Sequence, residues 1–197
     1  MSDDFTSCAL HEVRRSLADL IVWAGLHRKP ETVSQAVARR VKAQMKMLET
    51  ILRRLIMLIA LTLTLTPVKP RAPKQAKEDG DQIITKSHPP YSFGLSGQIQ
   101  VYTLDGPAFP DGERQASGPV PTAGLLRRYA AFARILKNPD RYARRVARSL
   151  ERLRAAGEPR PVCLAIDTRR LHPELGVMAS GLPMMLAAAF SRWNDTG

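Results

Sequence analysis

The chain has 197 residues, of which 44% are hydrophobic, and this is enough apolar material for one ordinary core or two small ones. An excess of 30 Lys and Arg over 18 Asp and Glu gives a net charge of +12, which favours nucleic acid, anionic lipid or an acidic protein as partner. Because Arg outnumbers Lys by 22 to 8 on an Ala- and Leu-rich background, codon usage in a GC-rich genome is an equally good explanation for part of this basicity. Two isolated cysteines argue against a disulfide framework or a zinc knuckle, and the charged first residues are unlike a secretory signal peptide, so we expect a cytoplasmic protein.

Charge and proline content divide the chain into three regions, residues 1–66, 67–122 and 123–197. Their net charges are +4, 0 and +8, and nine of the fifteen prolines lie between Pro67 and Pro121 together with six of the twelve glycines. Proline and glycine at this density interrupt regular structure. We therefore expect the middle region to be a linker or a loop-rich insert, with end regions that either pack together or form separate units.

Region 1–66 predicts a helical hairpin. Apolar residues recur at three- and four-residue spacing, which places them on one face of a helix from about Thr6 to Leu26. Pro30 interrupts this pattern, and the residues directly after it begin a second, longer helix. Pro67 stops this second helix at the latest. The alternation of Leu and Thr over residues 61–66 suits a strand, which leaves open an earlier end, before Leu61.

The remaining regions predict further helices and minor β structure. One strand is expected at residues 98–104 (QIQVYTL), where apolar and polar residues alternate, and a buried one at residues 162–166. A helix is predicted over Ala123–Lys137. A second helix is expected to start at Asn138-Pro139, because Asn caps free N–H groups and Pro suits the first helical position, and to end near Gly157.

The last predicted helix runs from Leu182 to Trp193, with Pro183 at its start, after a flexible connection that contains Gly176 and Gly181. The fold class that follows is mainly α: an N-terminal helical hairpin, a loop-rich middle rich in Pro and Gly, and basic C-terminal helices with minor β structure.

The most apolar window is the uncharged segment 55–68 (LIMLIALTLTLTPV). Its fourteen residues span about 21 Å as a helix, which is less than the roughly 30 Å of a hydrocarbon core. Arginines just upstream cost energy at the bilayer centre but can reach the interface. Three interpretations stay open: a buried core helix, an interfacial segment, and a tilted membrane span. The candidate membrane contacts are Leu55, Ile56, Leu58 and Ile59.

An arginine-rich segment follows Pro139 and predicts an amphipathic helix. At 100° per residue, one arc of roughly 100° holds the candidate contacts to an anionic surface, Arg141, Arg144, Arg145, Arg148 and Arg152. Such a stripe can bind duplex phosphates or lie on anionic lipid, but it also describes an ordinary solvated helix face. Aromatic residues are only 6% of the chain and are not interleaved with the arginines, which argues against a base-stacking platform.

No catalytic, cofactor or metal motif is found. Cys8 and His11 share a helix face, but two ligands do not make a zinc site. Cys163 lies in an apolar run, where a thiol is usually inert packing. Asp167 follows the predicted strand at residues 162–166, but no glycine-rich loop or second carboxylate accompanies it.

Two functional hypotheses follow, and neither involves a cofactor. The first is a non-enzymatic interaction protein at the cytoplasmic face of the cell membrane, which uses the apolar segment and its basic flanks to bind an anionic membrane surface or a partner protein. The second is a cytoplasmic accessory protein that binds nucleic acid through the arginine-rich helix. A third possibility is a helical subunit whose apolar arm is buried in another protein.

Overall fold

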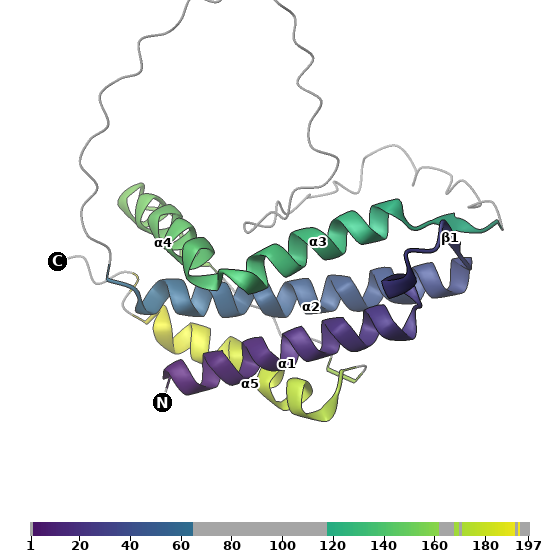
Figure 1. Ribbon diagram of the computed structural model, residues 1–197. Coiled ribbons are helices and arrows are strands. Elements are labelled where there is room, and N and C mark those ends of the chain that lie inside the picture. Colours follow the sequence, from purple (N-terminus) through teal and green to yellow (C-terminus); the bar gives the residue numbers. More distant parts are fainter. Residues whose placement is uncertain (1, 65–117, 162–167, 170, 192, 194–197) are drawn as a thin grey trace, which may run out of the picture.

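The computed structural model describes residues 2–64 and 118–193, apart from 162–167, 170 and 192 (Figure 1). These residues form five α-helices, one short 3-10 helix and a two-stranded antiparallel sheet, which confirms the mainly α fold class. In chain order the elements are α1 (Ser2–Trp23), η1 (Leu26–Arg28), β1 (Thr32–Val33), α2 (Gln35–Thr62), β2 (Val120–Pro121), α3 (Ala123–Lys137), α4 (Pro139–Ala155) and α5 (Pro173–Ala189). The strands predicted at residues 98–104 and 162–166 lie outside the described residues.

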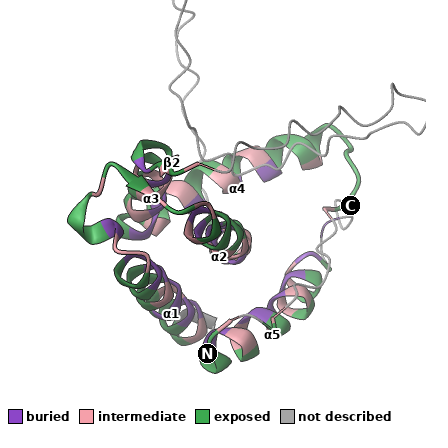
Figure 2. Cartoon of the chain, turned by 90° about the vertical axis from the view of Figure 1, so that its right-hand side faces the viewer, coloured by how far each residue is buried: buried purple, intermediate pink, exposed green. Residues whose placement is uncertain are grey.

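The longest helix, α2, is the central element of the fold. It contacts α1, α3, α4 and α5, and an end-on view shows it surrounded by these four helices (Figure 2). A helix that is covered on several sides needs apolar residues on more than one face. The C-terminal half of α2 meets this requirement, because eight of its ten residues from Ile51 to Ala60 are apolar.

The N-terminal hairpin is present, and α2 is its longer arm, with 28 residues against 22 in α1. Gly25 separates the arms in the left-handed conformation, with φ 68°, where glycine avoids the steric cost that a side chain meets. The start predicted for the second helix is wrong by about three residues. Residues 32 and 33 pair with β2 instead, and Ser34 caps α2 by accepting a hydrogen bond from the Val37 amide (3.3 Å).

The structure decides where the second helix ends, between the two alternatives that the sequence left open. The helix continues through Leu61 to Thr62, although the Leu-Thr alternation favoured a strand there. Ala60 is buried, and Leu61 packs against the core. Tertiary burial at this point outweighs the local preference of threonine for a strand.

The two end regions pack together into one hydrophobic core, although residues 65–117 separate them in sequence. Thr122 joins them by donating its hydroxyl to the Pro30 carbonyl, and its amide donates to the Glu31 carbonyl (3.0 Å). A second link is deeper, since Arg128 on α3 donates to both carboxylate oxygens of Glu49 on α2 (2.6 and 2.8 Å). The buried part of the core draws on all five α-helices.

The C-terminal helices match the sequence in part. The bounds of α3 are those predicted, and α4 begins at Pro139, although the Asn138 side chain makes no capping hydrogen bond. Gly157 follows α4 in the left-handed conformation, with φ 72°.

The prediction for the last helix is wrong. The helix begins at Pro173, not at Pro183, and it runs through the predicted flexible connection. Its interior proline is tolerated because Leu175, Leu182 and Leu186 are fully buried, and their packing offsets the lost backbone hydrogen bond.

Candidate anion-binding surface

The apolar segment identified in the sequence lies inside the helical bundle. Leu55 and Ile56 are fully buried, Leu58 is 3% exposed, and Ile59 packs partly buried against the same core. These candidate membrane contacts can therefore reach a bilayer only if neighbouring helices move away from α2. Within the described ranges, no helix combines the length and the hydrophobicity that a bilayer span requires.

The arginine-rich segment forms the outward side of α4. On the inward side, Ala143, Ala147 and Leu150 are buried, and the small volumes of the two alanines let α4 pack closely along α2. The five arginines predicted from the helical wheel are all exposed; we call them the α4 arginine face (Arg141, Arg144, Arg145, Arg148 and Arg152). The apolar side of α4 thus packs largely against the protein core, although Leu153 near its C-terminal end is 40% exposed, and the charged side faces solvent.

Few contacts within the described residues neutralise the positive charge of the α4 arginine face. In the part of the chain that the structure describes, none of its five guanidinium groups forms an ion pair with a carboxylate. Its members are instead neighbours of one another at three- and four-residue spacing. Each like-charged pair of this kind costs a helix about 0.2–0.5 kcal/mol. A bound anion would relieve this repulsion, so the face is suited electrostatically to a partner with closely spaced negative charges.

A second helix contributes to the same surface. Arg134 on α3 lines an open depression at the bend between α3 and α4. The α4 side of this depression is lined by Asp140, Tyr142 and four members of the arginine face, Arg141, Arg144, Arg145 and Arg148. Sequence analysis did not identify Arg134, because a helical wheel drawn for one helix cannot show a residue of another. The sequence signal that could have identified Arg134 is the very short connection between the two helices: only Asn138 separates them, so the end of α3 lies close to the start of α4.

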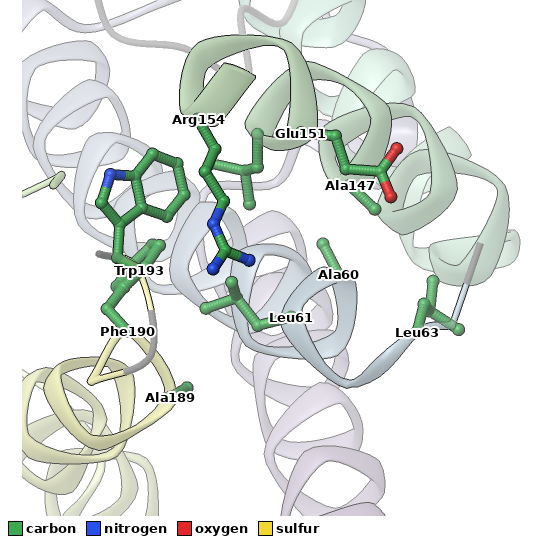
Figure 3. Close-up of a pocket in the computed structure, with 10 residues that line it drawn as sticks. Ala60, Leu61, Leu63, Ala147, Glu151, Arg154, Ala189, Phe190 and Trp193 are labelled. Atoms are coloured by element: carbon green, nitrogen blue, oxygen red, sulfur yellow. The ribbon is translucent and has the colours of Figure 1, made fainter. Parts of the chain in front are cut away.

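A different pocket, with a volume of about 280 Å³, lies where α2 and α5 end beside α4 (Figure 3). Its walls are mostly aliphatic and aromatic, and Phe190 and Trp193 meet edge to face with ring centroids 5.5 Å apart. The Trp193 indole donates to the Glu158 carbonyl (3.1 Å), and the Arg154 guanidinium extends toward Leu61. The charged residues among those that line this pocket are Glu151 and Arg154. A carboxylate can act as a base or a nucleophile, but no Ser, Cys, Lys or His lines this pocket beside it.

A cluster of possible metal ligands joins α1 to the start of α5, and sequence analysis did not identify it. One ligand atom from each of Glu12, His172 and Glu174 lies within 4.8 Å of the other two. Arg15 already interacts with both carboxylates, at 3.8 Å from Glu12 and 3.4 Å from Glu174. We interpret the cluster as an ion-pair link between the two helices, because the guanidinium supplies the positive charge that a metal would bring.

The remaining candidates from the sequence do not come together in a site. Cys8 and His11 are both exposed on α1, and they are not part of the cluster of possible metal ligands. Cys163 and Asp167 lie outside the described residues.

One arginine contacts an aromatic ring across the hairpin. Arg40 on α2 stacks over the half-exposed ring of Trp23 on α1, 4.4 Å from its centroid. The two residues lie on opposite arms of the hairpin, so their sequence spacing gives no signal of the contact.

The α4 arginine face is therefore the surface with the clearest chemistry: fixed positive charges, outward exposure and a second helix that adds to them. Its geometry is set by the packing of α4 against the core, not by a flexible tail. Comparisons of the chain with protein-family models, curated proteins and solved structures found no match, so the assignment of a function depends on this chemistry alone.

Proposed function

We propose that this protein binds nucleic acid and contacts the phosphate backbone of a duplex through the α4 arginine face. The observation that carries the proposal is the exposure of five arginines on one side of a helix whose other side is packed in the core. Arginine suits this role because its planar guanidinium stays charged and can donate two hydrogen bonds to one phosphate.

The dimensions of the face support a backbone contact. Eleven residue steps separate Arg141 from Arg152, so at 1.5 Å per residue the face is about 16 Å long. A duplex rises about 3.4 Å per base pair, so this length corresponds to roughly five base pairs. Contacts of this kind supply affinity and orientation without reading the base sequence. We therefore expect binding that depends strongly on salt and weakly on sequence.

Attachment to the cytoplasmic face of a membrane is the second candidate. The charges that would contact duplex phosphates would also be attracted to anionic lipid headgroups. An amphipathic helix holds a bilayer firmly by inserting its apolar side, however, and on α4 that side is packed against α2. Insertion through Leu55, Ile56 and Leu58 would require the bundle to open, because these side chains are buried. Burial of the apolar segment of α2 and of most of the apolar side of α4 is the reason for preferring nucleic acid.

The test compares two variants that lose the same charge from different surfaces. The first replaces Arg144, Arg145 and Arg148 by Gln. The matched control replaces three exposed basic residues of α2 by Gln, namely Arg39, Lys42 and Lys46. Fluorescence anisotropy with a labelled 20-base-pair duplex measures affinity at 0.1 M salt, and co-sedimentation with anionic vesicles measures lipid binding.

We expect the affinity of the α4 variant for the duplex to fall by about 10²–10³-fold, because binding with three fewer phosphate contacts releases fewer counterions from the duplex. The control variant should lose far less. Equal losses in the two variants would show that only net charge matters and would overturn the proposal. Vesicle binding without duplex binding in the unmodified protein would favour the membrane candidate instead.

A further inference from the structure

The depression at the α3–α4 bend differs from the rest of the α4 arginine face in shape. Arginines along a single helix lie on a convex surface and spread outward from its axis. In the depression, Arg134 from α3 lies across from the first turns of α4, so guanidinium groups border one open space from two helices. Such an arrangement can contact a small ligand from two sides. The other end of the α4 arginine face, near Arg152, can contact a ligand from one helix only.

The depression also concentrates positive charge. Five arginines and one carboxylate, that of Asp140, line it, which gives a local formal charge of +4. No ion pair joins Asp140 to any of these arginines within the described residues, so the carboxylate leaves the guanidinium groups available. The remaining lining residue, Tyr142, is partly buried and offers a hydroxyl donor.

We infer that this depression binds a compact phosphate group that carries more than one negative charge, and that Arg134 is one of its ligand-contacting residues. A duplex backbone offers one charge per phosphodiester, whereas a terminal phosphate or an oligophosphate chain concentrates two or more charges within the reach of several guanidinium groups. The inference rests on the proposed function for its phosphate chemistry, but it assigns a separate, smaller ligand and a residue of α3.

Isothermal titration calorimetry with sodium tripolyphosphate tests the site directly. The unmodified protein should bind about one tripolyphosphate per chain. Arg134→Gln should weaken this binding about tenfold, because it removes a charge-assisted hydrogen-bond donor. The matched control is Arg127→Gln, which changes an exposed arginine of the same helix outside the depression and should change the affinity less than twofold. Thermal unfolding of both variants checks that the fold is retained.

A third variant separates this inference from the proposed function. Arg152 belongs to the α4 arginine face but does not line the depression, so Arg152→Gln should weaken duplex binding and leave tripolyphosphate binding unchanged. Tripolyphosphate binding that depends on Arg134 in a protein that binds no duplex would support the site and refute the proposed function. Duplex binding without tripolyphosphate binding, or equal effects of Arg134→Gln and Arg127→Gln, would overturn the site alone.

The source of the phosphate follows from one further comparison. Two duplexes of the same sequence are titrated, one with 5′-terminal phosphates and one with 5′-hydroxyl groups. If the phosphorylated duplex binds more tightly and Arg134→Gln abolishes this difference in affinity, the site is assigned to nucleic-acid ends. Equal binding of both duplexes, with tripolyphosphate still bound, would assign it to a free oligophosphate.

Discussion

Replacing Ile56 by Ala tests whether the apolar segment of α2 is packed core. The side chain is fully buried, and the substitution removes three carbon atoms. Transfer of these atoms from the core to water costs about 2.4 kcal/mol at about 0.8 kcal/mol per carbon, and the cavity left behind raises the loss to about 3–4 kcal/mol. For a domain of this size, the melting temperature should fall by about 6–16 °C. Denaturant unfolding, followed by circular dichroism, measures the free energy directly.

The control for this prediction is Val177→Ala on α5, which removes apolar atoms from a side chain that is 74% exposed. Its effect on the free energy of unfolding should stay below about 0.5 kcal/mol. Equal effects of the two substitutions, together with weaker vesicle binding by Ile56→Ala alone, would show that Ile56 faces lipid and that the packing described for α2 is wrong.

Two further predictions concern contacts that join the helices. Arg128→Ala should lower the free energy of unfolding by about 2–3 kcal/mol in denaturant unfolding, because Glu49 is 3% exposed and loses two short, charge-assisted hydrogen bonds. The control, Arg127→Ala at an exposed neighbouring residue, should cost less than about 0.5 kcal/mol. Ser34→Ala should cost about 1 kcal/mol by removing the cap on the Val37 amide, whereas Ser34→Gly should cost only a few tenths; equal losses would contradict the capping role.

Local signals in the sequence were enough to locate the first four α-helices, although the ends of α1 and α2 differ from the predicted ones by a few residues. Gly25 and Pro30 mark the break in the hairpin, and Pro139 marks the start of α4, because these residues restrict the backbone whatever surrounds them. The helical wheel of α4 placed the five arginines on the exposed side correctly, since they follow the 3.6-residue period closely. It was less accurate for the apolar side, where Leu150 is buried but Leu153 is 40% exposed.

Features that depend on tertiary packing could not be predicted in the same way. Helix α5 contains Gly176, Gly181 and Pro183, which predict a break, and it is helical because its leucines are buried against the rest of the bundle. For the candidate site, the arginines of α4 follow from their spacing. Arg134 does not, because its place in the depression depends on the angle between two helices.

The burial of the apolar segment of α2 also depends on its neighbours. The sequence allowed a core helix, an interfacial segment or a membrane span, because all three require the same apolar composition. The choice among them depends on whether other helices cover α2, and the structure places α1, α3, α4 and α5 around it (Figure 2).

The most direct test of the central claim, that the α4 arginine face contacts duplex phosphates, is the dependence of duplex affinity on salt. The logarithm of the binding constant is measured against the logarithm of salt concentration for the unmodified protein and for the variant with Gln at Arg144, Arg145 and Arg148. Each phosphate contact contributes about 0.9 to the slope, so the slope should become shallower by about 2.7 in the variant. Two parallel lines would mean that these arginines touch no phosphate, and the account would be contradicted.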